Sequence, residues 1–149
     1  MSDQKSKPSD KTLAQLQKSL LECALSGQPL PGSDRPFRFP DLAFVKNQPE
    51  VFLLDENLAE SISVEDMPLP VRVMSRDELQ AAAQAEGDRT YLSFQPPHRA
   101  GDAVRLGLEA KIATPNPSQR ALGLSSVQVK FHKVGDDWQA DDEPTMLAS

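Results

Sequence analysis

Apolar and polar residues alternate along two segments in the second half of the chain. In "DAVRLGLEAKIATP" every second residue from Val104 to Ile112 is apolar, and the residues between them are charged or glycine. The segment "SSVQVKFHKV" repeats the pattern, with apolar residues at Val127, Val129 and Phe131. A period of two is typical of a strand that buries one face and exposes the other. Both segments are therefore predicted to be strands.

The end of the second segment predicts a tight hairpin. A two-residue turn favours glycine at its first position, which fits the Gly-Asp pair that starts at Gly135. This turn sets Lys133 opposite Trp138 and His132 opposite Gln139. Trp138 then lies on the core face of the sheet, and His132 lies on the outward face.

Three shorter segments also have strand character. "VFLLD", from Val51, is a continuous apolar run and is typical of a strand buried on both faces. "VRVM" starts at Val71, and "RTYLSF" starts at Arg89 and stops before Pro96. Together with the alternating segments and the hairpin, "RTYLSF" predicts four sequential strands, which form an antiparallel meander.

Two helices are predicted before the meander. The first runs from Asp10, with Ser9 or Asp10 as its cap, to Gly27. It carries a stripe of small and apolar residues at helical spacing: Leu13, Leu16, Leu20, Cys23 and Ala24. The second, near 76–86, has Ser75 and Glu78 in capping-box spacing and Gly87 at its end.

The connection over residues 28–66 stays open in conformation. Its five prolines from Pro29 to Pro49 exclude a long helix and break any strand into short pieces. Phe37 and Phe39 can anchor this segment in the core. If they are exposed instead, they form an apolar patch for a partner.

These elements predict an α+β fold, in which a curved antiparallel β-sheet packs against the long N-terminal helix and ends in the four-strand meander. The core covers residues 9–142 as a single domain. Residues 1–8 are predicted to be a disordered tail because they contain no apolar anchor, and residues 143–149 are predicted to be a flexible tail.

The N-terminal helix, the short middle elements and the terminal hairpin "KVGDDWQADD" together resemble cystatin-like and nuclear-transport-factor-like α+β rolls. The resemblance covers residues 89–142, and small bacterial proteins of this shape often end in such a hairpin. It implies several possible functions, from small-molecule enzymes to ligand binding and protein interaction. The catalytic residue sets of the enzyme members and the Gln-x-Val-x-Gly loop of cystatins are not found in this sequence.

Charge and composition narrow the classes of function. The formal net charge of -6 repels nucleic-acid phosphates and anionic membranes, so neither is an expected partner. A single cysteine, Cys23, excludes an internal disulfide and a cysteine-rich zinc site, and its place on the helix stripe predicts a buried, inert thiol. The polar start of the chain predicts no secretory signal, and we expect a cytoplasmic protein.

The candidate chemistry is limited. His98 and His132 are the only histidines. His98 follows two prolines in "PPHRAGD", which either joins two strands or places His98, Arg99 and Asp102 together at an edge of the sheet. The register of the strand places His132 on the outward face. We therefore predict no catalytic residue, no metal site and no cofactor.

The remaining candidate is the outward face of the meander. It is predicted to contact a ligand or a partner through these residues: Arg105, Glu109, Lys111, Lys130 and His132, with His98 and Asp102 beside them. Our first hypothesis is a non-enzymatic module that binds a protein partner or a small ligand, or that forms a homodimer through the sheet. The alternative is an enzyme of the roll type with a pocket between the first helix and the sheet.

Overall fold

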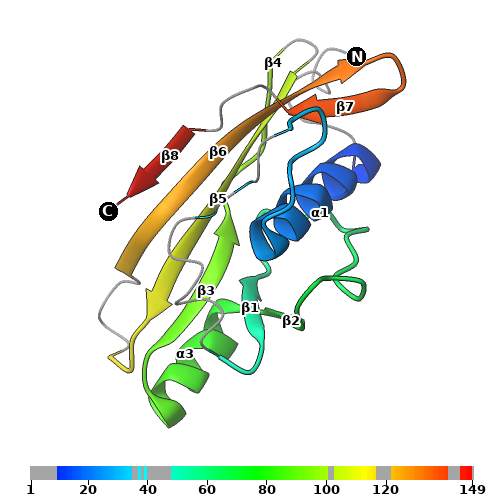
Figure 1. Cartoon of the computed structure of the whole chain (residues 1–149). Helices are drawn as coiled ribbons and strands as arrows, with labels where there is room; N and C mark the ends of the chain where they lie inside the picture. The colour runs from blue at the N-terminus through cyan, green and yellow to red at the C-terminus, as the bar shows by residue number, and fades with distance from the viewer. Residues whose placement is uncertain are drawn as a thin grey trace.

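The described part of the chain forms an α+β structure in which two helices pack against one mixed β-sheet (Figure 1). This computed structural model describes residues 10–34, 37, 39, 48–100, 103–116, 122–140 and 145–148. The helices are α1 (Asp10–Ser26) and α3 (Arg76–Glu86). The strands are β1 (Val51–Leu54), β2 (Val71–Met74), β3 (Arg89–Phe94), β4 (His98–Ala100), β5 (Ala103–Ala113), β6 (Leu122–Val134), β7 (Asp137–Ala140) and β8 (Thr145–Ala148).

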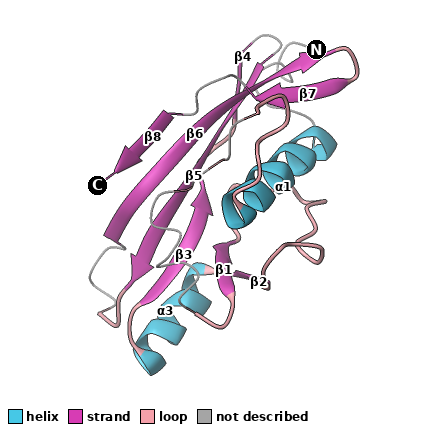
Figure 2. Cartoon of the chain, in the orientation of Figure 1, coloured by secondary structure: helices cyan, strands magenta, loops and turns pink. Residues whose placement is uncertain are grey.

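The sheet has the strand order β2-β1-β3-β5-β6-β7, with β4 paired to β5 and β8 paired to β6 (Figure 2). The predicted α+β class and the antiparallel meander of β3, β5, β6 and β7 are confirmed. The rest of the sheet differs from the antiparallel prediction, because β1 lies parallel to both β2 and β3. Continuous apolar runs such as "VFLL" are common in parallel strands, which have both faces covered.

Different helices pack against the two faces of the sheet. On the inner face, the buried residues of β5 and β6 pack in one cluster with α1. The outer face near β1, β2 and β3 is covered by α3. There a second cluster forms from Leu54, Met74, Leu79, Ala83, Tyr91 and Ala113. The remaining outer face, over β4, β5 and β6, carries the polar residues of the alternating pattern.

The terminal hairpin has the predicted register. Lys133 pairs with Trp138 and His132 pairs with Gln139, so Trp138 packs against the core side, where it is partly buried. Gly135 has φ of 63°, which a glycine adopts without the steric cost that a side chain brings. The two-residue turn is therefore confirmed.

The predicted capping box of α3 and the glycine at the end of each helix are confirmed. Ser75 and Glu78 form the predicted capping box of α3, and Gly87 follows its end. Gly27 ends α1 with φ of 79°, and its N–H donates to the Cys23 carbonyl at 2.8 Å. Ser9 lies outside the described residues. The Asp10 carboxylate accepts hydrogen bonds from the backbone N–H groups of residues 60 and 61, which ties the start of α1 to that loop.

Phe37 and Phe39 are buried, so they anchor the proline-rich connection, which is the first of the two possibilities that the sequence leaves open. Two other features differ from the predictions. The "PPHRAGD" segment contains a short strand, β4, in place of a simple connection. A further strand, β8, lies within residues 143–149, for which the sequence predicts a flexible tail.

Gln17 is a polar residue in the core that the helical pattern does not reveal. Its side chain is fully buried, donates to the Asn57 carbonyl at 2.7 Å and accepts from the Ala59 N–H at 2.9 Å. Asn57 adopts φ of 63° and donates its side-chain amide to the Phe94 carbonyl at 2.9 Å. These bonds join α1 to the loop after β1 and to the end of β3.

Replacing Gln17 with alanine should lower the free energy of unfolding. Gln17→Ala leaves the Ala59 N–H and the Asn57 carbonyl without these partners, at an expected cost of about 1–3 kcal/mol. Gln15→Ala is the matched control, because Gln15 is exposed on the same helix. Urea unfolding followed by circular dichroism measures both variants. Equal free energies of unfolding in the two variants would contradict a structural role for Gln17.

Candidate functional site

The candidate site is the part of the outer face, over β4, β5 and β6, that neither α1 nor α3 covers. Residues at odd positions of β5, and those at even positions of β6 from Ser126 to His132, point away from α1, because the residues that alternate with them are buried in the α1 cluster. This face contains the predicted residues that the structure describes: His98, Arg105, Glu109, Lys111, Lys130 and His132. Asp102 lies outside the described residues.

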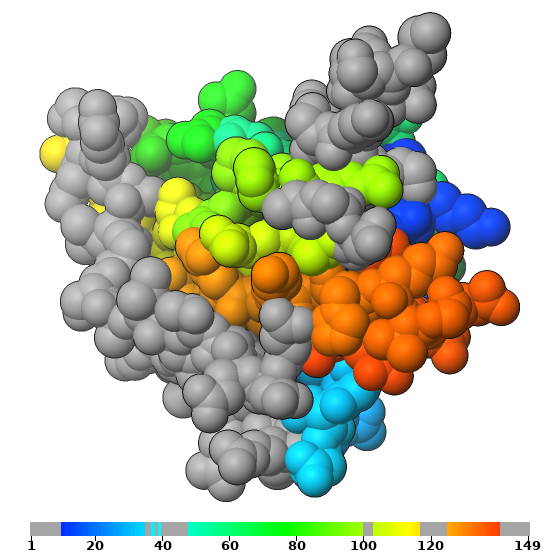
Figure 3. Space-filling model, turned by 90° about the horizontal axis from the view of Figure 1, so that it is seen from above, coloured from blue at the N-terminus to red at the C-terminus, as the bar shows by residue number. Residues whose placement is uncertain are grey.

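The strand register aligns three of these residues in one row across the sheet. His98 of β4 pairs with Arg105 of β5, and Arg105 pairs with Lys130 of β6. All three are exposed. Figure 3 shows the end of the molecule where yellow-green atoms of β4 and the start of β5 lie beside orange atoms of β6. We call His98, Arg105 and Lys130 the cationic row.

A bulge places His98 in this row. Between Phe94 and His98 the chain advances by four residues, whereas their partners Leu108 and Arg105 are three residues apart on β5. The extra residue falls at the two prolines, which cannot donate a backbone hydrogen bond to a neighbouring strand. Because of this offset, β4 continues the line of β3 with His98 facing outward beside Arg105.

The cationic row carries positive charge that the rest of the described chain does not neutralise. Neither Arg105 nor Lys130 forms an ion pair with any residue of the described ranges. Like charges that face each other directly across two strands repel. We therefore expect the Arg105–Lys130 pair to lower the stability of the fold.

Along β5, two small residues flank Arg105, and the side-chain amide of Gln95 lies over one of them. Ala103 lies on one side of Arg105 and Gly107 on the other. The Gln95 side chain occupies the space in which a Cβ of residue 107 would lie, and its Oε1 accepts from Gln128 Nε2 at 3.3 Å.

At the other end of the outer face, the charges are paired. Lys111 Nζ lies 3.3 Å from Glu109 Oε1, and these side chains are only 27% and 24% exposed. Beside them, Arg76 Nη2 at the start of α3 donates to Glu56 Oε1 at 2.8 Å, and Arg76 Nε donates to the second oxygen of the same carboxylate. Glu109 and Lys111 share the face with the row but neutralise each other, which the sequence alone does not show.

Two pKa shifts follow from this paired cluster. The hydrogen bond from Arg76 holds the pKa of the Glu56 carboxyl below its ordinary value. Burial raises the pKa of the Tyr91 hydroxyl, against a smaller opposing effect of Arg76. Tyr91 therefore stays protonated at neutral pH and is a hydrogen-bond donor, not a base.

The interface between α1 and the sheet is closely packed. Leu16, Leu20, Leu106, Leu108 and Phe131 are each at most 2% exposed and belong to one cluster, and the partly buried Leu13 packs against it. They lie where the alternative hypothesis of a roll-type enzyme expects a pocket, and that hypothesis stays an alternative. Cys23 lies in the same cluster, as predicted, and burial raises the pKa of its thiol to about 11.

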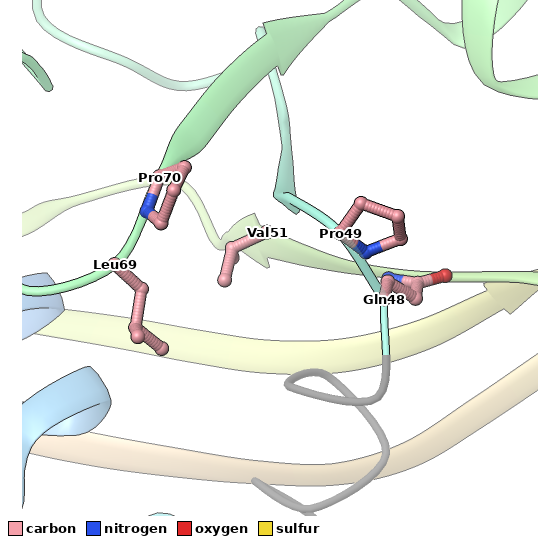
Figure 4. A pocket seen from close by; sticks show the side chains of 5 residues that line it. All are labelled: Gln48, Pro49, Val51, Leu69 and Pro70. Carbon is pink, nitrogen blue, oxygen red and sulfur yellow. The ribbon is translucent and has the colours of Figure 1, made fainter.

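A small hollow lies elsewhere, at the amino ends of β1 and β2 (Figure 4). Its cavity volume is about 70 Å³, and it is lined by Gln48, Pro49, Val51, Leu69 and Pro70. Pockets for drug-sized ligands have volumes of about 300–1,000 Å³. The hollow is thus too small for such a ligand. Within the described ranges, no three His, Cys, Asp or Glu side chains gather as metal ligands do.

Comparisons with known proteins give no relative from which to transfer a function. No protein-family model, no curated protein and no solved structure matches the chain. The resemblance to cystatin-like and nuclear-transport-factor-like rolls stays a prediction. Among the described residues, no helix is long and apolar enough to span a membrane.

Reversing the charge of Lys130 should raise the stability of the protein. Lys130→Glu converts the repulsive pair with Arg105 into an attractive one, and we expect the free energy of unfolding to rise by about 0.2–1 kcal/mol. Lys133→Glu changes the net charge equally at an exposed position of the same strand. If urea unfolding shows no difference between the two variants, the Arg105–Lys130 repulsion is not significant.

The Glu56–Arg76 pair predicts a pH-dependent contribution to stability. Because the pKa of Glu56 is lowered in the folded state, the pair stabilises the fold above the ordinary glutamate pKa and loses this effect as the pH falls through the folded-state pKa. Glu56→Gln should therefore lower the free energy of unfolding at about pH 7 but have a smaller effect at about pH 3. Glu65→Gln, at an exposed carboxylate, is the control. A constant Glu56→Gln effect at both pH values would refute this.

Proposed function

We propose that the protein is a non-enzymatic interaction module that binds a protein partner, or a second copy of itself, through the outer face of β4, β5 and β6. The single observation that supports this proposal is the like-charged pair of Arg105 and Lys130, which is exposed and lacks an ion-pair partner in the described chain. Residues that cost stability without a structural return are typical of functional sites.

The sheet around this pair is well packed on its other side, which makes the face a rigid platform. Leu106, Val129 and Phe131, which lie between the outward residues along β5 and β6, are at most 1% exposed. A partner that docks on such a face pays little entropy for ordering the backbone beneath it. Charged residues at an interface fix the orientation of the partner and increase the association rate.

A protein partner fits this surface better than a small ligand or a substrate. The described hollow at the start of β1 holds about 70 Å³ and lies apart from the cationic row, with a lining of other residues. The buried leucines between α1 and the sheet provide no support for the alternative of a roll-type enzyme. We also propose that the protein is cytoplasmic and that its fold is of the cystatin-like or nuclear-transport-factor-like roll type.

Site-specific photo-crosslinking in the source cells tests the proposal. Gln128 lies on the outer face next to the row, and Lys11 is exposed on α1. With p-benzoylphenylalanine in place of Gln128, we expect a discrete adduct with a second copy or with another protein. The same photoreactive residue in place of Lys11 should not give this adduct. If the Gln128 position gives no adduct beyond that of Lys11, the outer face is not an interaction surface.

A further inference from the structure

The spacing and charge of the cationic row identify the kind of partner that it fits. We propose that the row binds an acidic α-helix of a protein partner, which lies across β4, β5 and β6 with carboxylates on one face. This inference rests on the proposed function and specifies its partner. It concerns His98, Arg105 and Lys130, which come from three neighbouring strands.

The chemistry of the row favours carboxylates. Arg105 presents a planar guanidinium that can hold a carboxylate with two hydrogen bonds, and Lys130 presents an ammonium with three donors. An imidazole N–H of His98 adds a further donor at the end of the row. The row therefore consists of donors, and an anionic group that accepts hydrogen bonds complements it.

The geometry of the row favours a helix over an extended segment. Neighbouring strands lie about 4.8 Å apart, so the three residues repeat at this interval across the sheet. Side chains on one face of a helix repeat with every turn, at about 5.4 Å. Side chains on one face of an extended strand repeat at about 6.8 Å, because every second residue faces the same way. Over two steps the helix stays within about 1 Å of the row, whereas the extended strand departs by about 4 Å.

The space beside the row also suits a helix. Ala103 flanks Arg105 on one side along β5, whereas the Gln95 side chain fills the space over Gly107 on the other side. The small side chain of Ala103 lets the body of a helix approach on its side while the carboxylates of the helix reach the row. The protein already accommodates a helix on this side of the sheet, since α3 packs against residues that face the same way.

The charge of the whole molecule favours a protein over a nucleic acid. A net charge of -6 repels a polyanion such as DNA or RNA, whose phosphates extend far beyond the row. A helix with a few carboxylates needs only the local potential of Arg105 and Lys130. The complementary charges are then confined to the surface where the helix touches the row.

A titration of the isotopically labelled full-length protein with designed peptides tests this inference. The probe is an alanine- and glutamine-rich peptide of about 20 residues, with glutamates at positions i, i+3 and i+7 on one helical face. A second peptide has the same composition, but its glutamates are distributed around the helix. We expect saturable amide shifts in β4, β5 and β6 with the first peptide and a dissociation constant at least about tenfold higher for the second.

Charge variants locate the binding. Arg105→Glu with Lys130→Glu should weaken binding of the first peptide at least about tenfold, and Arg105→Gln with Lys130→Gln should weaken it without placing two like charges opposite each other. Lys11→Glu with Arg72→Glu is the matched control, because it removes one lysine and one arginine from exposed positions elsewhere. This control should bind as the unchanged protein does.

Three outcomes would overturn the inference. The first is that the two peptides bind equally, which indicates attraction by charge alone. The second is that the control variant loses as much affinity as the row variants. The third is that the helical peptide does not bind, or binds less tightly than a DNA duplex does. In each case an adduct from Gln128 in the photo-crosslinking experiment would still support the proposed interaction surface, so the two proposals fail independently.

Discussion

The alternation of residues along β5 is the constraint on which the rest of the structure depends. β5 is the strand that pairs with β3, β4 and β6, so its two faces set the two faces of the sheet. Its even positions from Val104 to Ala110 are at most 1% exposed and lie in the cluster that α1 covers. A shift of one residue would bury the charges and expose the leucines, which makes the register strongly specified. The same alternation presents Arg105 to solvent.

From this constraint the functional surface follows in two steps. Burial of the inner face by α1 fixes the strands, and the fixed register then brings His98, Arg105 and Lys130 side by side. The residues further along the face are paired, as Glu109 is with Lys111. The face thus has a neutralised end beside α3 and an unneutralised end at the cationic row. This asymmetry gives a partner a defined place and orientation.

The sequence predicts what depends on local patterns and misses what depends on distant contacts. Alternation gives the faces of β5 and β6, and the glycine turn gives the position of Trp138, because both are set within a few residues. The parallel placement of β1 and the strand β4 depend on pairing across the sheet, which no local period records. Gln17 is hidden for the same reason, since its partners lie about forty residues away along the chain. For the candidate site, the pattern finds which residues share the outer face, but only the side-chain positions show that Glu109 and Lys111 pair with each other.

The pairing of Arg105 with both His98 and Lys130 is the central claim, and nuclear Overhauser effects between backbone protons measure it most directly. The account predicts that the cross-strand contacts of Arg105 are strongest with Lys130 on β6 and with His98 on β4. Strongest contacts of Arg105 with Val129 or Phe131 would mean a register shifted by one residue. In that register Arg105 would not lie opposite Lys130, so the cationic row would not exist and the proposed surface would be wrong.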